Sequence, residues 1–82
     1  MAAYNERGIA YVGLGEYQRA IPDYDEAIRL DPRYALAHAN RAKNYTLLGM
    51  DPEAAQDVER AVELGRDRDA LESAIEELKK DR

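Results

Sequence analysis

The sequence contains no cysteine and a single histidine, His38. Without thiols there is no disulfide and no thiolate zinc site, and one imidazole is too few for a histidine-based metal site. No apolar run approaches the ~20 residues that cross a bilayer, and the N-terminus lacks the basic segment and apolar core of a signal peptide. We therefore expect no metal, no cofactor, no membrane contact and a cytoplasmic location.

Catalytic groupings are also missing from the sequence. His38 has no cysteine to activate, and we expect it to be a packed, partly exposed aromatic residue. Adjacent acids such as Glu76 and Glu77 are typical of solvated helix faces. The glycines follow no predicted strand, so they form no phosphate-binding loop. The formal charge of −5 argues against nucleic acid as a partner. We predict that the protein is not an enzyme.

The sequence instead contains a repeat of 34 residues that needs no gap. The matched positions are Ala3 with Ala37, Arg7 with Arg41, Tyr11 with Tyr45, Leu14-Gly15 with Leu48-Gly49, Ala20 with Ala54, Asp23 with Asp57, Ala27 with Ala61 and Leu30 with Leu64. Apolar residues within each unit recur at the spacing of amphipathic helices. A period of this length with two helices per unit indicates stacked helical hairpins.

The periodicity predicts five helices with glycine turns between the paired ones. Their expected ranges are residues 3–14, Tyr17 to Leu30, residues 35–47, Pro52 to Leu64, and Asp67 or Asp69 to about Lys80. Tyr4, Arg7, Gly8, Tyr11 and Leu14 are predicted to share the inner face of the first helix, and Gly65 to end the fourth.

Two helix starts carry specific expectations. Pro22 lacks an N–H, so we expect the second helix to begin late or to bend near Gln18 to Pro22. Asp51 followed by Pro52 predicts an N-cap at Asp51 and a helix that begins at the proline.

These residues resemble the tetratricopeptide repeat family. The first unit matches the family pattern at Tyr4, Gly8, Tyr11, Leu14-Gly15, Tyr17, Ala20, Tyr24, Ala27 and Pro32. The second unit matches it at His38, Ala42, Tyr45, Leu48-Gly49, Ala54, Val58 and Ala61. The resemblance implies an all-α fold, an α-solenoid of two antiparallel helix hairpins with a fifth capping helix. It divides one domain into repeats over 1–34 and 35–68 and a capping helix over 69–82.

Both units place an arginine sixteen residues before an aspartate, as Arg7 with Asp23 and as Arg41 with Asp57. In a hairpin that turns near Gly15, residues whose numbers sum to about thirty face each other. We predict a partly buried, bidentate ion pair inside each hairpin. The alternative is an anion-binding site built by the two arginines.

The resemblance also implies a protein or peptide partner. In the family, the first helix of each unit lines a concave face that binds peptides. The corresponding groove residues are Asn5, Ile9, Val12, Leu36, Asn40, Lys43 and Leu47. Their amides, single cation and apolar side chains suit an extended peptide. The alternative is that they are ordinary surface residues of a fragment.

One peptide class is not expected. Family members that grip acidic carboxyl tails of chaperones use lysine, arginine and asparagine at positions that correspond here to Asn5, Ile9, Asn40, Ala70 and Ala74. Only Asn40 agrees, and the cations are missing.

An alternative function is a structural unit without a peptide ligand, including an excised or designed piece of a longer array. Two repeats are few for a stable solenoid. The side of the first helix that carries Ala2, Ala3, Ile9 and Ala10 has no preceding helix to cover it. A second copy could stack there, or a hairpin could be swapped between copies, to form a homo-oligomer such as a dimer or a short array.

Overall fold

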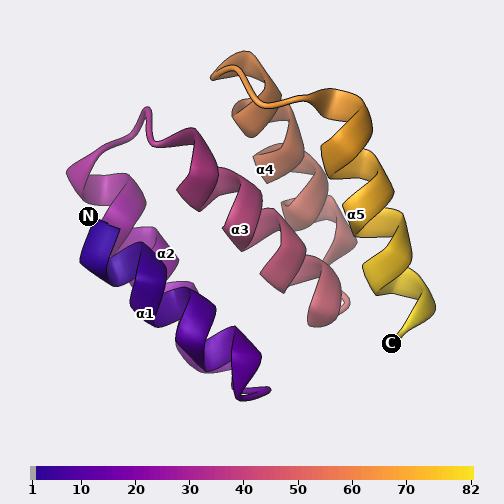
Figure 1. Cartoon of the computed structure of the whole chain (residues 1–82), viewed down its shortest axis with the longest axis horizontal. Coiled ribbons are helices and arrows are strands. Elements are labelled where there is room, and N and C mark those ends of the chain that lie inside the picture. Colours follow the sequence, from indigo (N-terminus) through magenta and orange to yellow (C-terminus); the bar gives the residue numbers. More distant parts are fainter. Residues whose placement is uncertain (1) are drawn as a thin grey trace.

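The chain folds into five α-helices, as a computed structural model that describes residues 2–82 shows (Figure 1). They are α1 (Ala2–Gly13), α2 (Tyr17–Leu30), α3 (Ala35–Leu47), α4 (Asp51–Glu63) and α5 (Arg68–Lys80). Residues 2–82 contain no strand. The predicted all-α class is confirmed, and each helix boundary lies within two residues of its expected place.

The helices are arranged as two hairpins and a cap. α1 packs against α2 and α3 against α4, while α2 also contacts α3 and α5 lies mainly on α3. Figure 1 shows α1, α3 and α5 side by side in one row, with α2 and α4 in a second layer. This order is that of an α-solenoid, in which the first helix of each hairpin faces one side.

The same glycine turn closes both hairpins. Gly15 and Gly49 have φ angles of 77° and 75°, in the left-handed region that glycine enters without a Cβ penalty. In the first turn the Glu16 N–H donates to the Tyr11 carbonyl at 2.9 Å, and in the second the Met50 N–H donates to the Tyr45 carbonyl at 2.8 Å. These bonds satisfy carbonyls that the helix end would otherwise leave unpaired.

Two expectations about helix starts are wrong, the late start of α2 and the N-cap at Asp51, while the alternative of a bend near Gln18 to Pro22 stays a prediction. α2 begins at Tyr17 without delay, with Pro22 inside the helix at a solvent-exposed position, where water can satisfy the carbonyl that a proline leaves free. Asp51 is the first residue of α4 and not its N-cap; Met50 holds that place without a side-chain bond. The Asp51 carboxylate binds Arg82 instead, at 2.6 and 2.9 Å.

The start of α5 shows the expected cap. The Asp67 carboxylate accepts a hydrogen bond from the Ala70 N–H at 3.1 Å, so Asp67 rather than Asp69 is the N-cap. At the other end, Lys79 and Lys80 lie in the last turn, where positive charge is favourable.

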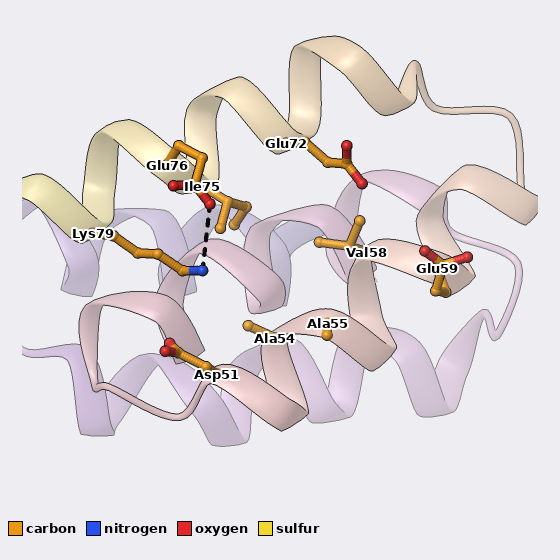
Figure 2. A pocket seen from close by; sticks show the side chains of 9 residues that line it. All are labelled: Asp51, Ala54, Ala55, Val58, Glu59, Glu72, Ile75, Glu76 and Lys79. Carbon is orange, nitrogen blue, oxygen red and sulfur yellow. Dashed lines mark hydrogen bonds and ion pairs between the residues drawn. The ribbon is translucent and has the colours of Figure 1, made fainter.

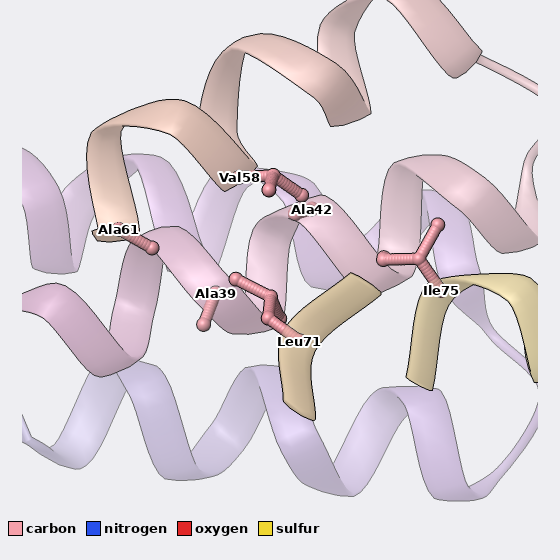
Figure 3. Packing of buried hydrophobic residues seen from close by; sticks show 6 residues of the cluster. All are labelled: Ala39, Ala42, Val58, Ala61, Leu71 and Ile75. Atoms are coloured by element: carbon pink, nitrogen blue, oxygen red, sulfur yellow. The ribbon is translucent and has the colours of Figure 1, made fainter. Parts of the chain in front are cut away.

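The core is built from small residues on α3 and larger ones on its neighbours. Figure 3 shows how the cluster packs: Ala39, Ala42, Val58, Ala61, Leu71 and Ile75. The alanines let the α3 backbone approach both α4 and α5. The prediction that Leu14 faces inward is wrong. It is 73% exposed, because α1 ends at Gly13 and the helical register no longer carries the next residue inward.

Candidate functional site

Each hairpin contains an arginine–aspartate pair that links its two helices. Arg7 donates from Nε and Nη2 to the two Asp23 oxygens at 2.9 and 2.6 Å. Arg41 does the same with Asp57, both at 2.8 Å. Both carboxylates are buried, and each bidentate pair raises the pKa of its arginine.

The second pair has an additional partner. Arg41 Nη1 also donates to Asp25 of α2, at 2.8 Å, and thereby joins the two hairpins. The Arg41 side chain is 20% exposed, whereas that of Arg7 is 59% exposed. Because the aspartates occupy these guanidinium donors, the arrangement does not favour the anion-binding alternative.

His38 lies beside the second ion pair. Its Nε2 is 2.9 Å from the Pro32 carbonyl oxygen, which can only accept, so Nε2 carries the proton. Its Nδ1 lies 3.9 Å from the Asp57 carboxylate. The residue is 6% exposed, so the expectation of a partly exposed aromatic is wrong. One ring nitrogen therefore faces Asp57 of α4 and the other binds the connection between α2 and α3.

Four of the predicted groove residues line one small hollow on the row of first helices. Its volume is about 130 Å³. The lining residues are Ile9 and Val12 of α1, Asn40, Lys43 and Asn44 of α3, and Tyr24 of α2. Tyr24 forms part of the lining, and its burial, together with the Asp23 charge, raises its pKa to about 12. The hollow combines an apolar wall, one cation and amide groups.

The other predicted groove residues lie elsewhere. Asn5 is only 2% exposed. Its Nδ2 donates to the Tyr34 hydroxyl at 3.4 Å, and its Oδ1 accepts from Asn40 at 3.1 Å. Asn5 therefore joins α1 to α3 below the surface instead of offering an amide to a ligand. Leu36 and Leu47 are half-buried and do not line this hollow.

Sequence reasoning did not identify Tyr24 and Asn44 as part of this hollow. Asn44 is fully buried, and its Nδ2 donates to the Tyr17 carbonyl at 2.9 Å. A polar residue in the middle of an amphipathic helix, ten positions into its repeat, was the available signal. It marks the place where α3 is fastened to the start of α2.

Two kinds of site have no counterpart in the described part of the chain. Residues 2–82 hold no group of three or more histidine, aspartate or glutamate side chains placed to bind a metal ion. Every helix within that range is too short or too polar to cross a lipid bilayer.

Comparison with known proteins shows several relatives. Residues 2–34 match the tetratricopeptide repeat family. The Hsp70-Hsp90 organizing protein of Triticum aestivum is 42% identical over 59 residues, which are 72% of this chain and 10% of that protein. Hsp70-Hsp90 organizing protein 3 of Arabidopsis thaliana is 39% identical over the same number, 72% of this chain and 11% of that protein. Sperm-associated antigen 1 of Mus musculus is 29% identical over 79 residues, which are 96% of this chain and 9% of that protein.

This chain spans about a tenth of the length of these relatives. The family match falls on the first hairpin, and the gapless repeat extends the same pattern to the second. The two antiparallel hairpins, their shared glycine turn and the sequence match agree, and the chain therefore belongs to the tetratricopeptide repeat family.

Proposed function

We propose that this chain is a protein-interaction scaffold that binds an extended peptide along the row of α1 and α3. Support comes from the family and from relatives that are named as organizers of other proteins. The observation that carries the proposal is the hollow lined by Ile9, Val12, Asn40 and Lys43. This hollow on the row of α1 and α3 combines an apolar wall with polar groups.

The chemistry of the hollow defines the peptide. A volume of about 130 Å³ accepts one aliphatic side chain against Ile9 and Val12. The Lys43 ammonium suits a carboxylate or a carbonyl oxygen of the peptide. Asn40 donates one N–H to Asn5, which leaves its second N–H for a peptide carbonyl. We infer a ligand with an aliphatic residue next to an acidic one.

The ligand differs from the chaperone tails that related modules grip. The two positions on α5 where those modules carry cations are Ala70 and Ala74, and Asn5 is buried against Tyr34. A terminal carboxylate flanked by several acids would find one cation, Lys43, on this row. The proposed ligand is therefore an internal peptide segment.

A binding experiment tests the proposal. A peptide array is first screened with the parent protein, and the best peptide is titrated against the Ile9→Ser, Lys43→Ala double variant. We expect affinity to fall at least about tenfold, since an apolar contact and a charge are lost together. Lys80→Ala is the matched control, because Lys80 is exposed on α5 and pairs only with Glu77. Unchanged affinity in the double variant would move the binding surface away from this row.

A specific observation favours the second candidate, self-assembly through the first hairpin. Among residues 2–82, the large exposed apolar side chains are Ile9, Leu14 and Leu30, and all three belong to that hairpin. Molecular mass in dilute solution separates the two functions. A dimer that becomes monomeric in a Leu14→Ser, Leu30→Ser variant supports assembly, and a strict monomer at every concentration contradicts it.

A further inference from the structure

Another hollow lies away from the proposed peptide row, between α4 and α5. Its volume is about 270 Å³. The lining residues are Asp51, Ala54, Ala55, Val58 and Glu59 of α4 and Glu72, Ile75, Glu76 and Lys79 of α5. Figure 2 shows these side chains facing one another across the gap. We call this hollow the α4–α5 furrow.

The furrow is open because α5 leans away from α4. Of the two helices in the preceding hairpin, α3 contacts the second, α2, more than the first, α1. For α5, its counterpart one repeat later, the order is reversed, since α5 packs mainly on α3 and contacts α4 little. Two bonds fasten α3 to α2: Asn44 to the Tyr17 carbonyl, and Arg41 to Asp25. A shift of 34 residues puts Leu78 and Ile75 at these positions of α5, where neither bond can form.

The residues of α4 also leave the furrow unfilled. On α2 the positions next to α3 hold Tyr17, Ile21 and Tyr24. On α4 the same repeat positions hold Asp51, Ala55 and Val58. Smaller side chains on α4 and a more distant α5 both enlarge the gap.

The repeat indicates what shape fits this gap. Glu72, Ile75, Glu76 and Lys79 of α5 correspond to His38, Arg41, Ala42 and Tyr45 of α3. On α3 that stripe lies against a helix, as the contacts of His38 and Arg41 with Asp57 of α4 show. On α5 Ile75 of this stripe packs in the core cluster, while Glu72, Glu76 and Lys79 line the furrow. Within residues 2–82 no helix follows α5 to take the place that α4 has against α3. The α4 lining runs over nine residues, from Asp51 to Glu59, and its ends are roughly 12 Å apart along the helix, or about two helical turns.

The charges indicate the chemistry of that helix. The floor is apolar, with Val58 and Ile75 buried and Ala55 exposed. Four carboxylates and a single ammonium, that of Lys79, line the furrow. A second, shallower hollow adjoins it through Glu72 and Glu76, and its charged lining is entirely acidic. A helix that enters here meets apolar side chains in the centre and carboxylates on both sides.

The carboxylates of the rim already have partners that a ligand can displace. Arg68 pairs with Glu59 and Glu72, and Arg82 pairs with Asp51. Lys79 pairs with Glu76 at 3.4 Å. These pairs are exposed, so each contributes little to stability and exchanges easily. Even with these cations counted, carboxylates remain in excess around the furrow.

We infer that the α4–α5 furrow binds a cationic amphipathic helix of a partner protein. About two turns of the helix lie in the gap, with small aliphatic residues on Ala55, Val58 and Ile75. Lysine or arginine residues on its flanks pair with Glu72 and Glu76 on one side and with Asp51 and Glu59 on the other. The mode is a helix in a groove, on a different face from the peptide row.

The probe is a fluorescent synthetic helix of about 14 residues, with alanine and leucine at i, i+3, i+4 and i+7 and lysine on both flanks. A second peptide has the same apolar stripe with glutamate in place of lysine. We expect the cationic peptide to bind, its affinity to fall with added salt, and the acidic peptide to bind at least about tenfold more weakly. Equal binding of the two peptides would overturn the proposal.

Variants of the protein locate the binding. Ala55→Tyr fills the furrow from an exposed position of α4, and Glu72→Gln, Glu76→Gln removes its charge on α5. Each change is expected to lower the affinity for the cationic peptide about tenfold or more. Glu63→Gln is the matched control, since Glu63 is an exposed acid of α4 that lines neither hollow. Circular dichroism checks that each variant keeps its helix content.

Two other results would contradict the proposal. If Lys43→Ala lowers the affinity for the cationic peptide as much as Ala55→Tyr does, the peptide lies on the α1–α3 row and the furrow is not its site. If sedimentation shows a dimer that Ala55→Tyr dissociates, a second copy of this chain fills the furrow. Binding that responds to Ala55→Tyr but not to Lys43→Ala supports the furrow, whatever the outcome of the peptide-row experiment.

Discussion

The two hairpins place the same ion pair in different surroundings. Arg7 has the edge of the molecule on one side and remains 59% exposed, while Arg41 lies between α2 and α4 and is 20% exposed. Asp25 accepts a hydrogen bond from Arg41, and Arg7 has no such additional partner among residues 2–82. The same two residues at the same spacing are thus a partly hydrated link in the first hairpin and a nearly enclosed junction in the second. In a repeat protein, neighbouring units determine how much a repeated contact contributes.

A second difference concerns the size of the packed side chains. In the first hairpin Gly8 lies against Tyr24, and in the second Ala42 faces Val58 at the same repeat positions. A Cβ built on Gly8 would come within 2.7 Å of Tyr24 Cε1 and within 2.9 Å of its Cζ. The first hairpin combines the smaller residue with the larger partner, and the second uses two of intermediate size.

The largest expected effect comes from removal of Asp57. Asp57→Ala leaves Arg41 enclosed with one remaining exposed partner and takes away the charge beside His38. We expect the free energy of unfolding to fall by about 3 kcal/mol. Asp23→Ala is the matched variant, and its loss should be clearly smaller because Arg7 can rehydrate. Urea denaturation measures both. Equal losses would show that the surroundings of the arginine do not matter.

The second effect tests the size difference between the hairpins. Gly8→Ala forces a methyl group against the Tyr24 ring, and we expect a net loss of about 1–2 kcal/mol even though alanine favours the helix. In the Gly8→Ala, Tyr24→Val double variant the first hairpin has the residues of the second. Its loss should be smaller than the sum of the single losses. Additive losses would contradict a direct contact between the two positions.

The third effect appears only at alkaline pH. Burial raises the pKa of Tyr24 to about 12, so between pH 10 and 12 the unfolded state loses this proton while the folded state keeps it. Stability should therefore fall as pH rises, by about 1 kcal/mol at pH 11. Tyr24→Phe removes this contribution, whereas Val58 gives the second hairpin no equivalent. Burial also raises the pKa of Tyr45, so this second tyrosine contributes to the pH dependence of stability. The Tyr45→Phe variant measures that contribution. A pH profile unchanged in Tyr24→Phe would disprove the assignment.

The smallest effect concerns the link between the hairpins. Asp25→Ala removes the contact of Arg41 with α2, and because Asp25 is half exposed we expect a loss of about 0.5 kcal/mol that shrinks in high salt. Glu6→Ala, at an exposed α1 position that forms no ion pair with any of residues 2–82, is the control for a plain surface change. A loss as large as that of Asp57→Ala would place the main contribution between the hairpins.

Much of the fold followed from the sequence because its information is local. The repeat of 34 residues defines two helices per unit, and the antiparallel geometry brings Arg7 to Asp23 by arithmetic alone. The turn glycines and the Asp67 cap depend on backbone angles over a few residues. Leu14 was misplaced because one residue beyond the end of a helix has no register, and the sequence does not fix that end so closely.

The candidate site was harder to predict because it depends on side-chain partners and helix tilt. Asn5 looked like a surface amide, but its partner Tyr34 comes from the connection between α2 and α3. The α4–α5 furrow was not foreseen. Its size depends on how far α5 leans toward α3, which follows from two missing bonds and three smaller side chains acting together.

The unequal pairing of Gly8 with Tyr24 and of Ala42 with Val58 also prevents the helices from exchanging partners. If α3 paired with α2, the Ala42 methyl would collide with the Tyr24 ring, and if α1 paired with α4, a void would separate Gly8 from Val58. Two nearly identical hairpins in one polypeptide would otherwise compete for each other's halves during folding. The mismatch in size makes the sequential pairing, α1 with α2 and α3 with α4, the more stable one.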